Sequence, residues 1–466
     1  MIDCSESPDK RSGALRNVGG IKPFLRPDSY TRPRSVLAYL ALFCGIATFV
    51  PGNTVAATIA ACLAIALGWG NLRLVGRVLF SLIILFTLVA LAYEPAALPR
   101  ATGNMARIGA LIITVMLLSA VLGQSNDLKV ISRSLFAGQS LSRYLGMTLG
   151  TALLSVPLNF GAVGVVATMV GVQVKEQGDS ALARNAARAV VRGFGASPMA
   201  SPLSISIVMA VTFLPDLSSW KLIAVGLPIA IMYLMAGTLS REEEPPRAED
   251  IAVAPTAEQS ALFPWLRFVG IIALICAGAF VLSAKVGLVY SQSVTLSCLT
   301  AVVIGLFYRR VADGVMSLPS LAGMNNELVI MGGSSFLGGI IGTFALSWLG
   351  VDFSLAVWAY PLVAMAVPWL FFLGGAIGVN PIISGTLSGS ILGPIWPEYG
   401  LLGLGLGMVT GWGITIAGTP YSANALLLER CTGYSAHTAS YGWSLRFSLA
   451  ALVVCSLVCA AFTLPF

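Results

Sequence analysis

Apolar runs of about 20 residues recur along the whole chain, and this feature restricts its fold more than any other. Hydrophobic residues make up 57% of the 466 and charged residues only 10%. A soluble domain usually carries about a quarter charged residues, so most of this surface must face lipid. Because about 20 apolar residues span a bilayer as a helix, the sequence predicts an all-α polytopic membrane protein.

The apolar runs can be assigned one by one. We expect about eleven transmembrane helices, each near the length that crosses the hydrocarbon core. Two further apolar stretches, 144–173 and 355–397, are interpreted as re-entrant hairpins that enter and leave the membrane on one side. The expected spans are 36–51, 53–70, 75–93, 108–123, 186–216 (interrupted), 221–237, 263–283, 287–308, 328–349, 401–428 (interrupted) and 444–466.

The basic residues test this topology. If the N-terminus is cytoplasmic, all but four of the 27 lysines and arginines fall on the inside, and the four outside are Arg100, Arg107, Lys221 and Lys285. Such a bias fits the positive-inside rule and predicts a multi-pass protein of a bacterial-type inner membrane. The net charge of +7 then reflects orientation and contact with anionic membrane lipids, and we expect no nucleic-acid partner.

Four parts can be distinguished along the chain. We expect a disordered basic cytoplasmic tail (1–34), a first transmembrane half (35–240), a cytoplasmic linker (241–260) and a second transmembrane half (261–466). The first span is an extra one, and the rest of the first half forms one repeat. Most of the cysteines sit singly inside apolar runs, and no spacing is typical of a metal site.

The two halves share an order of features. A Pro-Leu-Asn-Phe-Gly segment around Asn159 is followed by Gly-Ala-Ser-Pro from Gly195 and then by Trp220. The corresponding residues of the second half are Asn380, Gly418 and Trp443. The Asn-to-Gly spacing is 36 and 38 residues, and the Gly-to-Trp spacing is 25 in both halves. Since the two hairpins open from opposite sides, the halves are expected to be inverted repeats, a recurring transporter design.

Polar, Gly- and Pro-bearing segments interrupt the apolar runs at four places, two hairpin tips and two broken helices. Non-helical backbone inside a membrane is tolerated only where protein or a water-filled cavity covers it. Half-helix N-termini offer partial positive charge to an anion, and freed carbonyls can hold a cation. The pattern therefore predicts a secondary transporter with its substrate site between the two halves.

The second-half stretch Ala417–Asn424 and the later Gly433-Tyr434 resemble the Gly-Thr-Pro-Pro-Asn segment and the Gly-Tyr of the divalent anion/sodium symporters. These symporters belong to the ion transporter superfamily, with the arsenite antiporters as relatives. The first-half stretch Gly193–Pro198 resembles the equivalent earlier segment. The resemblance covers roughly residues 140–466. It implies a homodimer, a small anionic substrate and elevator-type movement of a transport domain.

By this resemblance, the tips and the broken helices bind the substrate and the coupling ion. The family carries Ser-Asn-Thr at both tips, whereas only the asparagines match here, and Phe160 at the first tip suits a substrate with a hydrophobic or aromatic portion. The expected site residues are Asn159, Gly161, Gly195, Ser197, Ser201, Asn380, Ser384, Thr386, Gly418, Thr419 and Asn424.

The coupling ion is expected to be sodium, and no cofactor is expected. Sodium can be held by carbonyls, amides and hydroxyls, whereas a proton-driven carrier usually keeps an ionisable group in the membrane. The nearest such group is Glu327, which we interpret as a solvated carboxylate at the start of a helix. Two alternatives stay open, a lipid-phosphate flippase and a membrane-embedded enzyme that acts on a lipid-linked substrate.

Overall fold

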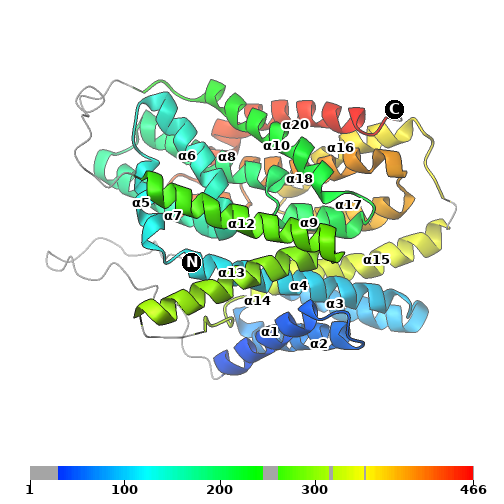
Figure 1. Ribbon diagram of the computed structural model, residues 1–466. Helices are drawn as coiled ribbons and strands as arrows, with labels where there is room; N and C mark the ends of the chain where they lie inside the picture. The colour runs from blue at the N-terminus through cyan, green and yellow to red at the C-terminus, as the bar shows by residue number, and fades with distance from the viewer. Residues whose placement is uncertain (1–29, 245–260, 314–317, 351–352, 465–466) are drawn as a thin grey trace.

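The computed structural model describes residues 30–244, 261–313, 318–350 and 353–464. All regular structure in these residues is helical, and ten of their helices are long and apolar enough to cross a membrane (Figure 1). The predicted fold class, an all-α polytopic membrane protein, is confirmed. Residues 1–29 of the expected tail and 245–260 of the expected linker lie outside the described residues.

The first half of the chain supplies a helical pair, two long helices, a short surface helix, a helical hairpin and a broken helix. The elements are α1 (Thr31–Ile46), α2 (Asn53–Leu67), α3 (Leu74–Tyr93), α4 (Ala97–Leu122), α5 (Asn126–Ser134), α6 (Ser140–Leu158), α7 (Phe160–Gln177), α8 (Ala181–Ala200), α9 (Ile205–Phe213) and α10 (Ser219–Ala236).

The second half repeats the hairpin, the broken helix and the final helix. The elements are α12 (Leu262–Val286), α13 (Tyr290–Asp313), α14 (Asn325–Glu327), a π-helical segment η3 (Leu328–Gly333), α15 (Ser334–Leu349), α16 (Ala359–Ala376), α17 (Pro381–Leu392), α18 (Leu401–Gly418), α19 (Ala423–Thr432), a second π-helical segment η6 (Thr438–Gly442) and α20 (Trp443–Ala461).

Each predicted span and hairpin corresponds to helix, with some differences at the ends. Helix α4 begins at Ala97, where the prediction placed a loop before 108, so Arg100 and Arg107 lie on this helix. Helices α1 and α2 have only 16 and 15 residues, fewer than the about 20 that span a bilayer. The tail prediction was wrong for residues 31–34, because these form the first turn of α1 and Arg34 is buried.

The helices form two bodies, each built from both halves of the chain (Figure 1). In the scaffold body, α4 packs against α1, α2, α13 and α15, and α12 packs against α13. In the hairpin body, α8 packs against α6, α10 and α18, α19 packs against α7, and α18 packs against α16 and α20. The bodies meet where α4 contacts α6 and where α15 contacts α17.

The two hairpins enter the hairpin body from opposite ends. Arg143 at the start of α6 forms an ion pair with Glu244, at the same end as Arg184 and Arg188 at the start of α8. We call this arginine-rich end the basic end. Helix α16 begins at the opposite end, where the Tyr360 hydroxyl donates to the carbonyl of Ile395. The predicted inverted hairpins therefore bring their tips together in the middle of the molecule.

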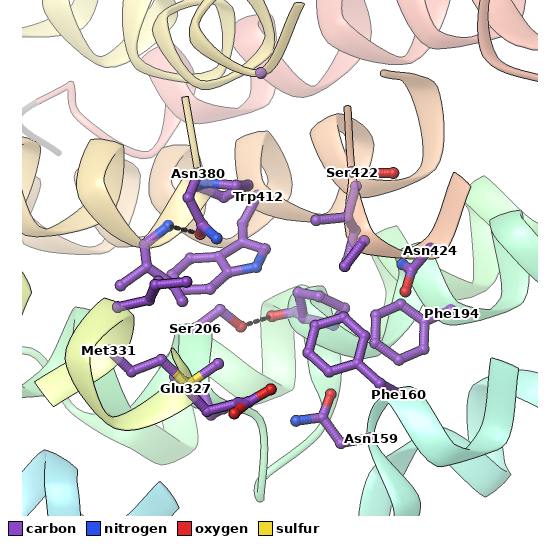
Figure 2. Close-up of a pocket in the computed structure, with 18 of the residues that line it drawn as sticks. Asn159, Phe160, Phe194, Ser206, Glu327, Met331, Asn380, Trp412, Ser422 and Asn424 are labelled. Carbon is purple, nitrogen blue, oxygen red and sulfur yellow. Dashed lines mark hydrogen bonds between the residues drawn. The ribbon is translucent and has the colours of Figure 1, made fainter. Parts of the chain in front are cut away.

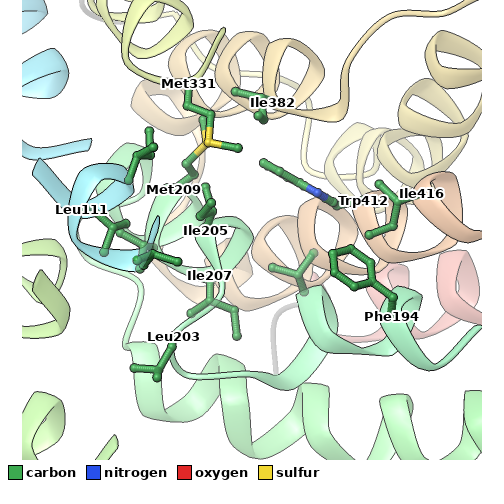
Figure 3. Packing of buried hydrophobic residues seen from close by; sticks show 14 of the residues in the cluster. Leu111, Phe194, Leu203, Ile205, Ile207, Met209, Met331, Ile382, Trp412 and Ile416 are labelled. Carbon is green, nitrogen blue, oxygen red and sulfur yellow. The ribbon is translucent and has the colours of Figure 1, made fainter. Parts of the chain in front are cut away.

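The two broken helices cross each other closely. An added Cβ at Gly413 in α18 would lie 2.3 Å from the backbone oxygen of Gly195 in α8. Both helices unwind just beyond this crossing, α8 at Ser201–Ser204 and α18 at Thr419–Ser422. Buried side chains of α8, α9 and α18, including Phe194, fill the space beside the crossing (Figure 3). The packing thus fixes both breaks at the centre of the fold.

Candidate substrate-binding site

A cavity of about 330 Å³ lies where the two hairpin tips and the two broken helices meet (Figure 2). The scaffold body completes its wall with the start of α3 and with α14 and η3. Small-molecule sites in proteins usually have volumes of about 300–1,000 Å³. All four interruptions that the sequence predicted near the midplane therefore contribute to one small-molecule-sized cavity.

Four helices begin at the wall of this cavity: α7 at Phe160, α9 at Ile205, α17 at Pro381 and α19 at Ala423. Each N-terminus carries partial positive charge, because the amides of its first turn have no partner within the helix. Four such termini around one cavity favour an anion.

Three of these N-termini are capped by a side chain of the preceding residue. The Ser204 hydroxyl accepts from the amide of Ile207 at 3.4 Å, the Asn380 side chain from that of Ile382 at 3.0 Å and the Ser422 hydroxyl from that of Ala425 at 3.2 Å. These caps fix where the helices begin, and each leaves other amides of the first turn for a ligand.

The first tip differs from the other three. Asn159 has a φ of 49° and is the one residue other than glycine with a positive φ in the described part of the chain. Its side chain does not cap α7, although it lines the cavity. The Ser119 hydroxyl of α4 holds the tip by donating to the carbonyl of Leu158 at 2.9 Å. A strained residue at a cavity is typical of a functional position.

Asn424 offers unused hydrogen-bonding groups. Its side chain is fully buried, and neither the amide oxygen nor the amide nitrogen has a partner among the described residues. Buried polar side chains are nearly always paired, so an unpaired one at a cavity points to a ligand or water. Asn424 lies at the first turn of α19, beside Ser422 (Figure 2).

Aromatic side chains form one wall. The rings of Phe160 and Phe194 stack with centroids 5.4 Å apart, and Trp412 lines the cavity from α18 (Figure 2). Flat apolar rings of this kind pack well against an aromatic or apolar ligand. The cavity therefore combines a polar, electropositive region with an apolar one.

The charged residues in the wall are Arg73 and Glu327, both on the scaffold body toward the basic end. Asn326 holds this region, since its side chain accepts from the amide of Arg73 at 2.9 Å and donates to the carbonyl of Asn71 at 3.2 Å. Glu327 lies in the first turn of α14 and is half-buried, and its Oε2 is buried without a partner among the described residues. No group of three His, Cys, Asp or Glu side chains in the described residues could hold a metal.

Five of the eleven predicted site residues line this cavity. They are Asn159, Ser197, Asn380, Thr419 and Asn424. They come from both tips and both breaks, as the repeat predicted.

Two predicted glycines lie in close helix contacts. An added Cβ at Gly195 would lie 2.7 Å from Cβ of Ala417, and one at Gly418 would lie 2.4 Å from Oγ of Ser448. These residues shape the site by letting helices approach, and they are not among the residues that line it.

The other four predicted residues face neighbouring elements. Gly161 lies beside Ser119, Ser384 beside Gly374 of α16, and Thr386 beside Gly338 of α15. Ser201 is buried at the C-terminal end of α8, where its amide donates to the carbonyl of Ser197 at 2.9 Å.

Sequence reasoning missed Phe194, Trp412 and the serines that begin α9. The Ser204-Ile-Ser206 segment, which follows Pro202, carries a usable signal, since a serine before an apolar run is typical of a helix start. For Trp412 no signal existed, because in a helix that is apolar all round, such as α18, the sequence does not indicate which side chains face a cavity.

The fold and the cavity together define the class: a polytopic helical membrane protein in which two helical hairpins and two broken helices surround a central cavity. No family model and no curated protein matches the chain. Among solved structures, the chain is similar to the YdaH transporter of Alcanivorax borkumensis, with 17% identity over 80% of this chain and 88% of that one and a TM-score of 0.48. It is also similar to MtrF of Neisseria gonorrhoeae, described as illuminating a class of antimetabolite efflux pumps, with 14% identity over 81% and 85% of the two chains and a TM-score of 0.50. The similarity to MtrF is one of fold.

Proposed function

We propose that the protein is a secondary transporter of a small organic anion that carries an aromatic or apolar portion. The observation that carries this proposal is the convergence of four helix N-termini on one cavity whose wall holds a single carboxylate, that of Glu327. The stacked rings of Phe160 and Phe194 would contact the apolar portion. A cavity of about 330 Å³ suits a small anion better than a lipid-linked phosphate or the substrate of a membrane-embedded enzyme.

Alternating access is part of the proposal. Toward the basic end, Arg73 and the exposed Leu426 line the cavity. Toward the opposite end, α9, α15 and α17 pack tightly, because added Cβ atoms at Gly338 and Gly389 would lie within 3 Å of Thr386 and Phe213. With the basic end in the cytoplasm, as the positive-inside rule indicates, this is an inward-open state. Elevator-type sliding of the hairpin body along the scaffold body, within a homodimer in an inner membrane, would open the other side.

We further propose sodium as the coupling ion and an origin shared with the divalent anion/sodium symporters. Oxygen ligands for sodium are at hand in Asn159, in Thr419 and in the second lone pair of Asn380 Oδ1, which also caps α17, and all three residues line the cavity. Glu327 is the group on which a proton-coupled alternative would depend. The description of MtrF as an efflux pump makes export of an aromatic antimetabolite anion one candidate direction for this chain.

Ligand-induced thermal stabilisation of the purified protein tests the proposal, because a ligand that binds only the folded state raises apparent stability. The panel contains aromatic and aliphatic carboxylates, inorganic oxyanions and a polyprenyl phosphate, each with sodium or with potassium. We expect a sodium-dependent shift with aromatic carboxylates that Asn159→Ala, Asn380→Ala and Asn424→Ala abolish.

The matched control is Asn53→Ala, at the start of α2 and outside the cavity wall, which should keep the shift. A shift with polyprenyl phosphate alone would contradict the substrate class and favour a flippase. A shift that is independent of sodium and lost in Glu327→Gln would replace sodium by proton coupling.

A further inference from the structure

A second cavity, of about 590 Å³, lies between the two bodies at the end opposite the basic end. The scaffold body contributes α4 and the ends of α12 and α13 that face each other, and the hairpin body contributes the connection between α9 and α10. None of its lining residues belongs to the wall of the central cavity. It is a separate feature that the proposed transport function does not use.

Two arginines dominate its polar surface. Arg100, Asn104 and Arg107 all line the cavity and recur at intervals of four and three residues, which places them on one face of α4. Arg107 Nε donates to the carbonyl of Gly103 at 3.2 Å and Nη2 to Asn104 Oδ1 at 3.4 Å. These contacts hold the guanidinium in place without neutralising it, and neither arginine pairs with a carboxylate within the described residues.

Lysines and a helix N-terminus add to this positive charge. Lys221 lies with Nζ 5.9 Å from the ring centroid of Trp220, which lines the cavity, and Lys285 directly follows the lining residue Ala284. Helix α10 begins at Ser219 in the cavity wall, and the Ser218 side chain does not cap it. Of the four basic residues that the sequence placed outside, Arg100 and Arg107 thus line one cavity, and Lys221 and Lys285 directly follow two of its lining residues. Two acids lie at this end: Asp216 is exposed on the α9–α10 connection, and Glu94 is half-buried at the end of α3, three residues before α4 begins.

The remaining wall is mostly apolar, with Thr212 and three serines among its lining residues, and it reaches the exposed surface. Phe280, Leu288 and Trp220 line it, and Trp220 is exposed over 59% of its surface. An arginine pair with an apolar wall at a membrane interface matches an anionic headgroup whose attached chain lies along the wall, since guanidinium groups bind phosphate in a bidentate manner.

We propose that this cavity is a second binding site, for a phosphate-bearing anion, formed by Arg100 and Arg107 of α4 together with the N-terminus of α10. The ligand is an anionic phospholipid headgroup or a free phosphoanion, which share this chemistry. Tyr290 couples the site to the broken helix, because this residue lines the cavity and its hydroxyl donates to the carbonyl of Pro202 in the α8–α9 break at 2.8 Å. An occupant would therefore contact both bodies at once.

Native mass spectrometry of the full chain in neutral detergent tests the proposal. The probes are phosphatidylglycerol, phosphatidylcholine and glycerol 1-phosphate. We expect at least a tenfold preference for phosphatidylglycerol over phosphatidylcholine. We also expect at least a tenfold loss of phosphatidylglycerol affinity in the double variant Arg100→Gln, Arg107→Gln, since each bidentate contact is worth roughly a factor of ten. Competition by glycerol 1-phosphate would identify a soluble phosphoanion as a ligand, and its absence would identify the lipid.

The matched control is Arg446→Gln, an exposed arginine of α20 near the basic end, which should bind like the wild type. Equal affinity of the double variant, the control and the wild type would overturn the proposal. If the double variant fails to fold, the wild type still decides, because equal binding of the two lipids with no binding of glycerol 1-phosphate would also overturn it.

Discussion

Replacing Gly413 by alanine should loosen the crossing of the two broken helices. The new Cβ would lie 2.3 Å from the backbone oxygen of Gly195 and 2.7 Å from Cε of Met199. The methionine can move, but the carbonyl belongs to α8 and cannot yield without shifting that helix. Overpacking of this kind costs typically about 1–3 kcal/mol, and alanine returns up to about 1 kcal/mol through its higher helix propensity. Because the clash is with backbone, we expect a net loss of about 1–2 kcal/mol.

The measurement is thermal unfolding of the purified protein in one detergent. Gly270→Ala is the matched control, because Gly270 also lies in a helix, α12, and an added Cβ there would meet nothing within 4 Å. The control should unfold at the wild-type temperature or slightly above it, and Gly413→Ala several degrees below. If both variants unfolded at the same temperature, α8 and α18 could not be as close as described. That result would also contradict the packing role of Gly195.

Three further substitutions test single contacts. Asn424→Leu should leave the unfolding temperature unchanged or raise it, because burying an unpaired amide costs about 1–3 kcal/mol. The same variant should lose ligand-induced stabilisation. A large drop in its ligand-free unfolding temperature would contradict this prediction. Tyr290→Phe should cost about 1 kcal/mol by removing the hydrogen bond to Pro202, and unchanged thermal unfolding would count against that contact. The hydrogen bond from Tyr434 holds the pKa of Asp179 below its ordinary 3.8, so the carboxylate stabilises the fold above that pH and loses its effect as the pH falls through the lowered pKa. The small stability difference between wild type and Asp179→Asn should therefore shrink as the pH falls below 3.8, and a difference that stays constant would refute the assignment.

The sequence was sufficient to predict the helical hairpins and broken helices because a membrane limits the alternatives. Backbone that is not helical inside an apolar run must be covered by protein or by a water-filled cavity. A polar motif such as the one at Asn159 therefore predicts a covered tip. The start of α4 was missed for the opposite reason. Residues 97–107 are too polar to count as part of an apolar run, yet Thr102, Asn104 and most of their neighbours are buried against other helices.

The site was predicted less completely than the fold. The asparagines of both tips could be found because they interrupt an apolar pattern. Ser384 and Thr386 follow the second tip in sequence, but α17 begins at Pro381, and its rotation turns their side chains toward α16 and α15. The position of a hydroxyl relative to a cavity depends on helix rotation and neighbour packing, which hydropathy alone does not specify.

The two halves of the site have the same arrangement of hairpin tip and broken helix, but their asparagine side chains differ in the hydrogen bonds that they make. At the second tip, Pro381 begins the helix and the Asn380 side chain is occupied by capping it, which makes a rigid end. At the first tip, Asn159 holds a strained backbone and its side chain does not cap α7. Across the cavity, Asn424 is buried with both amide atoms unpaired. An inverted repeat would allow two equivalent half-sites, but these residues place the uncommitted polar groups on the first tip and on α19. The charged part of a substrate should therefore lie between Asn159 and Asn424, and its apolar part should lie along the stacked rings.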